Sequence, residues 1–265
     1  MCQNIPSNVI EYTFHGKSFS GLSDCLPVEV VDLYLCLKCR ECKDKKVYFL
    51  PSKVVTSIFC SSCDSDDCCP VHASLSAVDI ESYDVLIGAI HEGGCHWTLV
   101  AICPVEGKIL YIDPRGETEA TKHLYKQQWL NYLTDRYNKD IGNYLGENWN
   151  VSSIGHQKQS DFNSSGVLIL KFADRLLSKN EHFPFGFSNE DIKTFRMQIG
   201  QYLVKCSESF KDLSSVPQDE QNSCVIQILG NLSGIKIVCD DEDSENAKDD
   251  SLLSCLFQKE ISMFL

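Results

Sequence analysis

The chain has 265 residues with a formal net charge of −13, and 43% of its residues are hydrophobic. This composition favours a globular protein with a substantial core, built as one large domain or two small ones. The acidic balance argues against nucleic acids and anionic membranes as partners, since both attract basic surfaces. The sequence has no apolar run of membrane-spanning length and no N-terminal pattern of a secretory signal, so we expect a cytoplasmic or nuclear protein.

The first half of the chain predicts a helix followed by strands. Apolar residues at helical spacing predict an amphipathic helix over residues 29–39. A short strand follows and is interrupted by Pro51, which lacks the N–H group that a strand ladder needs. Residues 83–90 predict a buried strand, and residues 96–114 predict a hairpin of two apolar strands.

The second half predicts three helices and one strand. Residues 119–138 and 189–206 have helical periodicity, and residues 149–154 favour a strand. Residues 166–178 form a helix that is apolar nearly all round at its start, so we expect it to be buried. One side of the 119–138 helix carries Leu124, Trp129, Tyr132 and Leu133. This order of elements predicts an α+β fold with a small sheet and helices packed against it.

Three polar residues stand at the ends of these elements. His96 opens the first strand of the hairpin, Asp113 closes the second, and Ser165 stands at the start of the buried helix. Antiparallel strands place the start of one beside the end of the other, so the hairpin brings His96 and Asp113 together. This arrangement is typical of a triad in which a carboxylate orients an imidazole and the imidazole takes a proton from a nucleophile.

The chemistry of such a site depends on the atom at position 165. A helix N-terminus carries partial positive charge, which lowers the pKa of a cysteine thiol and favours the thiolate. The same charge helps a serine much less, because its hydroxyl must lose its proton during the attack. Gln159 lies six residues earlier, and its side-chain amide is able to donate to a developing oxyanion.

The stretches GGCHWTLVAI, ILYIDP and QKQSDFNSSGVLILKFA together resemble the Ulp/SENP cysteine proteases, which process and deconjugate SUMO and related ubiquitin-like modifiers. That family has His-Trp on a strand, Asp at the end of a following strand, and Gln followed after five residues by Cys-Gly. The resemblance covers about residues 18–208. It implies a papain-like fold of the Ulp and adenain type, with a small central mixed sheet and a buried helix that bears the nucleophile.

The resemblance also implies a role for each matching residue. His96 is the general base, Asp113 orients it, position 165 carries the nucleophile, and Gln159 supports the oxyanion hole. Trp97 lines the channel through which a Gly-Gly tail reaches the nucleophile. The implied activity is that of a thiol isopeptidase that cleaves after the C-terminal Gly-Gly of SUMO or ubiquitin and needs no cofactor. Its partners are the modifier and its conjugates.

Two positions depart from the family pattern. Ser165 stands where the family has its nucleophilic cysteine, so we expect the chain as given to bind a modifier without cleaving it. The serine fits an engineered inactivation, a natural pseudoprotease that binds a ubiquitin-like protein, or a working serine variant. The tryptophan that roofs the channel in the family is also missing, which leaves both SUMO and ubiquitin open as the modifier. An acyltransferase on the same scaffold is a further alternative.

The cysteine-rich segment allows two interpretations. The pairs Cys39-x2-Cys42 and Cys60-x2-Cys63 have a spacing that is typical of a structural zinc site. Cys36, Cys39 and Cys42 also continue a helical pattern in which thiols pack into a core. A zinc ion would stabilise an insert at about residues 60–72 and take no part in catalysis, so we assign no metal to the catalytic site.

The chain therefore divides into two predicted regions. Residues 1–208 form the protease-like domain, and residues 209–265 form a C-terminal extension. The extension contains an acidic run at residues 240–250, which we expect to be solvated and mobile.

Overall fold

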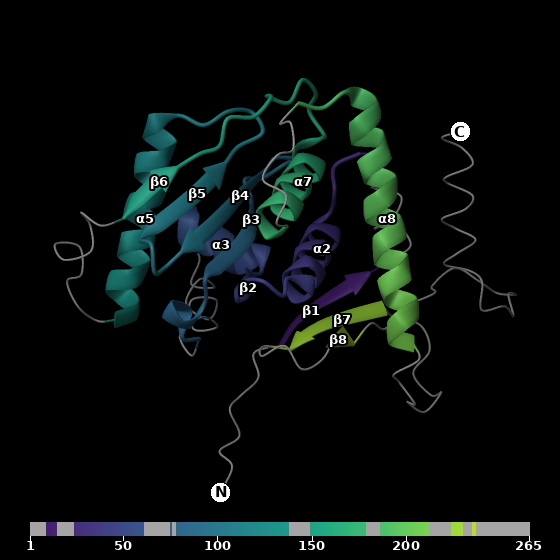
Figure 1. The fold of residues 1–265 in the computed structure, drawn as a ribbon, viewed down its shortest axis with the longest axis horizontal. Helices are drawn as coiled ribbons and strands as arrows, with labels where there is room; N and C mark the ends of the chain where they lie inside the picture. Colours follow the sequence, from purple (N-terminus) through teal and green to yellow (C-terminus); the bar gives the residue numbers. More distant parts are fainter. Residues whose placement is uncertain are drawn as a thin grey trace, which may run out of the picture. The chain divides into compact units, whose positions relative to one another are not determined.

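The fold is described from a computed structural model, shown in Figure 1. The structure describes residues 9–14, 24–60, 75, 78–137, 149–178, 186–211, 224–229 and 235–236. The chain divides into two compact units, one formed by residues 31–192 and the other by residues 1–30 together with 193–265. Among the described residues, no helix has both the length and the apolar character needed to cross a bilayer.

The unit of residues 31–192 is built on a five-stranded sheet with the order β2-β3-β4-β5-β6. Its strands are β2 (Val47–Leu50), β3 (Val85–His91), β4 (Trp97–Cys103), β5 (Lys108–Ile112) and β6 (Asn150–Ser152). The two outer pairs, β2 with β3 and β5 with β6, are parallel, whereas β3, β4 and β5 run antiparallel. The sheet is therefore mixed, and the predicted α+β fold with a small central mixed sheet is confirmed.

The register of the central hairpin places two polar residues at the same edge of the sheet. Leu99 of β4 pairs with Ile112 of β5, and the turn between the strands contains Gly107 at a φ of 59°. Glycine adopts this left-handed conformation without a steric penalty. Because β5 ends beside the start of β4, the residues just outside the two strands, His96 and Asp113, lie at the same edge of the sheet.

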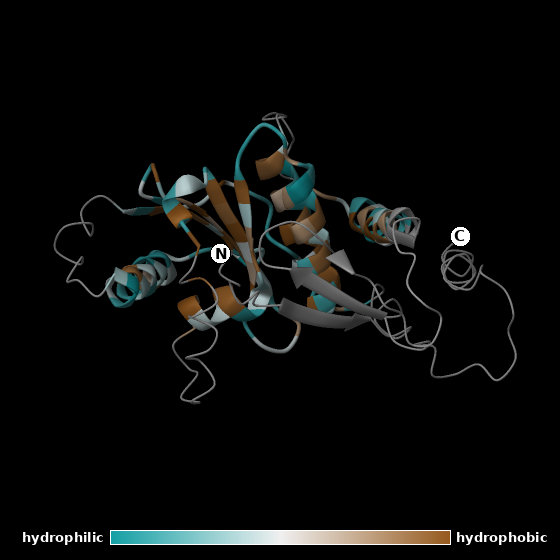
Figure 2. Cartoon of the chain, turned by 90° about the horizontal axis from the view of Figure 1, so that it is seen from below, coloured by the Kyte–Doolittle hydropathy of each residue, from teal (hydrophilic) through white to brown (hydrophobic). Residues whose placement is uncertain are grey.

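Helices cover both faces of this sheet, as Figures 1 and 2 show for α5 (Glu119–Tyr137) on one side and α7 (Ser165–Leu177) on the other. The first six residues of β4 are all buried, as expected for a strand that is packed on both faces. The first half of α7 is buried as predicted, and Figure 2 shows the strands and this helix as largely hydrophobic. The sheet and α7 thus form the core that holds the N-terminus of α7 against β4.

Two expectations for the helices need correction. Pro51 ends β2 as predicted, but it is also the N-cap of an additional helix, α3 (Ser52–Phe59), because an N-cap residue contributes its carbonyl to the first helical hydrogen bonds and does not need an N–H group. In α5, Trp129, Tyr132 and Leu133 are buried as predicted. Leu124 is 49% exposed, because the first turns of α5 bury Tyr125 instead. The predicted helix over residues 29–39 is confirmed as α2 (Val28–Glu41).

The other unit joins the two ends of the chain. Strand β1 (Val9–Phe14) pairs antiparallel with β7 (Cys224–Leu229), which in turn pairs with β8 (Ile235–Lys236). The late helix predicted over residues 189–206 is present as α8 (Asn189–Lys211). The domain boundary between residues 208 and 209 stays a prediction, and the predicted insert at 60–72 and acidic run at 240–250 lie largely outside the described residues.

Candidate active site

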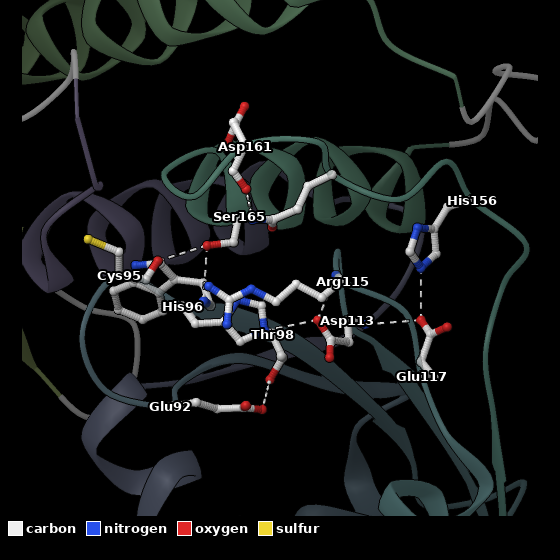
Figure 3. Close-up of polar contacts among 12 residues, drawn as sticks. Glu92, Cys95, His96, Thr98, Asp113, Arg115, Glu117, His156, Asp161 and Ser165 are labelled. Carbon is white, nitrogen blue, oxygen red and sulfur yellow. Dashed lines mark hydrogen bonds and ion pairs between the residues drawn. The ribbon is translucent and has the colours of Figure 1, made fainter.

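His96 and Asp113 form a buried hydrogen-bonded pair, drawn in Figure 3. The distance from His96 Nε2 to Asp113 Oδ1 is 2.9 Å, and their side chains are 7% and 15% exposed. The turn just before His96 contains Gly93 and Gly94 at φ values of 86° and 57°. On the other side, the Arg115 backbone N–H donates to the same Asp113 oxygen at 2.8 Å. The structure therefore brings together the pair predicted from the hairpin.

The aspartate selects one tautomer of the histidine. A carboxylate only accepts hydrogen bonds, so in neutral His96 the proton lies on Nε2 and Nδ1 carries the lone pair. Among the described residues, His96 Nδ1 is buried and has no hydrogen-bond partner. Nδ1 is therefore the nitrogen that is available to accept a proton from a nucleophile.

Ser165 is the first residue of α7 and is fully buried. Its Oγ donates to the Cys95 carbonyl at 2.9 Å and accepts from the Trp97 backbone N–H at 3.2 Å. Both partners are backbone groups that flank His96, as Figure 3 shows for the Cys95 carbonyl. The contacts of Ser165 within the described structure do not include the His96 imidazole. The serine thus lies next to the histidine, but its proton is held by a carbonyl.

The loop before α7 is ordered by Asp161. One of its carboxylate oxygens accepts from the backbone N–H groups of Asn163 and Ser164, at 3.0 and 2.8 Å, and the other accepts from the Ser164 hydroxyl at 2.6 Å. The N–H groups of a helix N-terminus have no partners within the helix, so a carboxylate here stabilises the start of α7. This loop sets the position of residue 165.

Gln159 lies in the same loop and is linked to the Asp113 segment. Its backbone N–H donates to the Pro114 carbonyl at 2.8 Å. Its side-chain Nε2 donates to the Asp161 carbonyl at 2.7 Å, and its Oε1 is buried without a partner among the described atoms. One amide hydrogen is therefore used within the loop, and the predicted oxyanion role depends on the second hydrogen.

Trp97, which is predicted to line the channel, is buried in the structure. Its residue surface is 1% exposed, and its ring centroid lies 4.5 Å from that of His91. The role of Trp97 as a channel wall stays a prediction.

The structure contains a second histidine–carboxylate pair that the sequence did not indicate. His156 Nε2 lies 2.9 Å from Glu117 Oε1, and the same oxygen accepts from the Asp113 backbone N–H at 3.0 Å. Burial by itself raises the pKa of Glu117, but the hydrogen bonds from His156 and the backbone outweigh it and lower the pKa to about 2. Burial lowers the pKa of His156, and the hydrogen bond to Glu117 outweighs this and raises it. No local motif marks these two residues, which lie 39 positions apart.

Cys36 and Cys39 of the predicted zinc segment are buried thiols, whereas Cys42 and Cys60 are partly exposed. Burial raises the pKa of Cys36 to about 12, and burial also raises that of Cys39 well above its usual value. Cys42 Sγ donates to the Leu177 carbonyl at 3.4 Å. No group of three or more metal-ligating side chains occurs among the residues that the structure describes. Cys63 lies outside them, so the zinc site is neither supported nor tested as a whole.

Three comparisons with known proteins bear on this site. Residues 24–207 match the Ulp1 protease family, C-terminal catalytic domain. A comparison with curated proteins finds no match.

Similar solved structures include the SUMO protease Ulp1 with its catalytic cysteine oxidised to a sulfenic acid, at a TM-score of 0.57, 14% identity, and coverage of 72% of this chain and 83% of that one. The C-terminal Ulp1 protease domain in complex with Smt3, the yeast orthologue of SUMO, has a TM-score of 0.53 at 14% identity, with 72% and 86% covered. The Ulp1-like SUMO protease catalytic domain of Chaetomium thermophilum has a TM-score of 0.51 at 15% identity, with 67% and 71% covered.

At this level of identity the solved structures establish the fold, and the family match spans most of the chain. The sequence match and the shared fold lead to one conclusion: this chain belongs to the Ulp1 protease family and contains its C-terminal catalytic domain.

Proposed function

We propose that this chain recognises the C-terminal tail of a ubiquitin-like modifier, and that with cysteine at position 165 it cleaves the bond after the terminal Gly-Gly. The single observation that carries the proposal is the buried His96–Asp113 pair, preformed at 2.9 Å beside the first residue of α7. A related Ulp1 domain forms a complex with Smt3, so a SUMO-like protein is the first candidate for the modifier. Ubiquitin is the second candidate.

In the cysteine form, His96 takes the thiol proton and the thiolate attacks the carbonyl carbon of the terminal glycine. The oxyanion that forms accepts hydrogen bonds, for which Gln159 is the proposed side-chain donor. Collapse of this intermediate breaks the bond to the substrate lysine amine, which receives the proton from His96. A water molecule then gives its proton to His96 and hydrolyses the thioester, which releases the modifier and restores the thiol.

With Ser165 the same site favours binding without turnover. The hydroxyl donates to the Cys95 carbonyl, whereas the available nitrogen of His96 stays without a partner in the described structure. A serine hydroxyl is also far less acidic than a thiol, so the helix N-terminus does not ionise it. A second function is therefore favoured for the chain with Ser165: it binds a ubiquitin-like modifier and does not cleave it.

The test compares the chain as given with Ser165→Cys. Each is incubated with SUMO and with ubiquitin that carry a thiol-reactive electrophile at the C-terminus. We expect a covalent adduct with one modifier, formed only by the Ser165→Cys form and lost when His96→Ala is added. We also expect the unaltered chain to bind that modifier in a titration. The absence of both an adduct and binding for every modifier would contradict the proposal.

A further inference from the structure

The Glu117–His156 pair adjoins the catalytic pair on the side of Asp113. It has no role in the chemistry proposed above. The two side chains are 13% and 2% exposed, so the pair is shielded from solvent. Charged groups at such depth are retained in proteins when they are paired and hydrogen-bonded. Exposed charged residues keep a protein soluble, but a shielded pair does not serve this purpose. The role of Glu117 and His156 must therefore come from the groups that they contact.

Glu117 touches the backbone of the catalytic aspartate directly. Its Oε1 accepts from the Asp113 N–H at 3.0 Å, while Asp113 itself accepts from His96 Nε2 at 2.9 Å. A further bond from the Gly116 N–H to the Asp113 carbonyl, at 2.8 Å, closes the same turn. The position of the Asp113 carboxylate therefore depends on where Glu117 is held.

His156 holds Glu117 from the segment that leads to the nucleophile position. Its Nε2 lies 2.9 Å from Glu117 Oε1, its Nδ1 lies 3.0 Å from the Gln157 carbonyl oxygen, and its ring centroid lies 5.1 Å from that of Phe172 in α7. The bond from the Gln159 N–H to the Pro114 carbonyl joins the same two segments. The pair thus connects the segment of the aspartate to the segment of the oxyanion donor, as Figure 3 shows for Asp113, Glu117 and His156.

The contacts of His156 fit the imidazolium form. A carboxylate oxygen and a backbone carbonyl oxygen only accept hydrogen bonds, so both ring nitrogens must carry a proton to satisfy them. The charged groups that act on His156 are the carboxylates of Glu117 and Asp113, and its neighbour on α7, Phe172, is apolar. Loss of one proton would leave a lone pair facing an oxygen and weaken one of the two bonds.

We infer that Glu117 and protonated His156 act as a positioning pair that holds Asp113, and through it His96, in register with the loop before α7. The inference rests on the proposed function for its catalytic consequence, since it deepens the account of the same site. Neither residue touches the substrate. Their effect passes through the backbone N–H of Asp113 and the geometry of the His96–Asp113 pair.

The first test uses the chain as given and needs no enzymatic activity. NMR of the histidine rings should show that His156 titrates above its usual value of 6.5, and that Glu117→Gln lowers its pKa towards that value. The same substitution should weaken or shift the low-field signal of the His96 Nε2 proton, because Asp113 is no longer held in place. A His156 ring that titrates normally, or a His96 signal that Glu117→Gln leaves unchanged, would overturn the inference.

The second test measures hydrolysis in the Ser165→Cys background. Glu117→Gln and His156→Gln should each lower kcat/KM by about 10- to 100-fold, mainly through kcat, because small misplacements of catalytic groups have effects of this size. The double variant should be no worse than the poorer single variant, since residues that act as a unit are not additive. Independent effects that multiply, or losses confined to KM, would contradict a positioning role.

Matched controls separate this role from general loss of charge. Glu119→Gln makes the same change two residues away, at a side chain that is 90% exposed, and His123→Gln removes an exposed imidazole. Both controls should keep the parent kcat and leave the His96 signal unchanged. If Ser165→Cys hydrolyses no modifier, the proposed function fails, while the NMR test still decides the positioning pair. Folding of each variant is checked by its thermal transition, and the isosteric Glu117→Gln avoids the cavity that alanine would leave.

Discussion

At the scale of single residues, the backbone before His96 depends on glycine. Gly94 has a φ of +57°, and no heavy atom lies within 4 Å of the position that a Cβ would occupy. A side chain would therefore fit in the available space, and only the left-handed backbone conformation disfavours it. The left-handed conformation costs an L-residue about 1–2 kcal/mol. A residue such as alanine at this position would therefore strain the turn before His96.

We predict that Gly94→Ala lowers the free energy of unfolding by about 1–2 kcal/mol in a urea titration. Gly155→Ala is the matched control, because Gly155 also has open space around its Cβ position but has no left-handed φ. The control should be neutral or slightly stabilising, by ~0.4–1 kcal/mol, through its effect on the unfolded chain. Equal losses for the two variants would contradict the conformational explanation.

The Glu117–His156 pair also gives folding stability a pH dependence. The pKa of Glu117 is lowered to about 2, so its contribution is present above its usual value of about 4.5 and is lost as the pH falls towards 2. The pKa of His156 is raised, so its contribution is present below about 6.5 and is lost as the pH rises through the raised value. The pair contributes fully where the two ranges overlap.

We therefore predict that the Tm difference between the parent chain and Glu117→Gln is largest between about pH 4.5 and 6.5. It should shrink on both sides of this window, because one partner loses its charge on each side. Thermal unfolding monitored by circular dichroism across this range measures the difference. A Tm difference that is constant with pH would show that the variant acts through packing alone.

At the scale of secondary-structure elements, α3 begins at a carboxylate from α2. Asp32 is fully buried and accepts from the Ser52 backbone N–H at 3.1 and 3.0 Å, one distance for each carboxylate oxygen, and also from the Ser52 hydroxyl. Negative charge is favourable at a helix N-terminus, where backbone N–H groups lack partners within the helix. A buried carboxylate on α2 thus stabilises a helix that was not recognised in the sequence.

Asp32→Ala should lower the free energy of unfolding by about 1–3 kcal/mol, because it leaves buried donors at the start of α3 without an acceptor. The control is Glu41→Ala, which removes an exposed carboxylate of α2 that pairs with Lys38 at 3.3 Å. Exposed pairs of this kind contribute about 0.2–1 kcal/mol, so the control should have a smaller effect. Chemical denaturation of both variants provides the comparison.

At the scale of the whole molecule, the two ends of the chain share one sheet. Val9 pairs with Leu229 and Phe14 with Cys224, so β1 has its strand partner in the predicted C-terminal extension. An isolated strand has no ladder and is not stable on its own. The extension therefore has a structural role for the N-terminal segment.

We predict that removal of residues 212–265 abolishes hydrogen-exchange protection at residues 9–14 while leaving the β4 amides protected. The first loss follows from the missing partner β7, and the second from the separate unit to which β4 belongs. Hydrogen exchange followed by mass spectrometry on the full and shortened chains distinguishes the two regions. Retained protection at residues 9–14 would show that β1 has another partner.

The sequence by itself determined the elements that carry the site and the residues at their ends, although it did not indicate α3. Period-two and helical patterns arise from local geometry, so the hairpin, its His96 and Asp113, and the buried helix at Ser165 could all be placed without coordinates. The family resemblance rested on the same residues, and the sequence match and the shared fold confirm the family. Position 165 was recognisable as a departure because its neighbours keep the pattern.

Only the tertiary structure decided the contacts between residues far apart in the chain. The hydroxyl of Ser165 is bonded to the backbone around His96, the Trp97 ring is buried, and Glu117 meets His156 across 39 positions. None of these contacts has a period or a spacing, because each depends on how two segments pack once the sheet and α7 are in place. Local propensities specify the elements, whereas the partner of a buried polar atom is set by the whole fold.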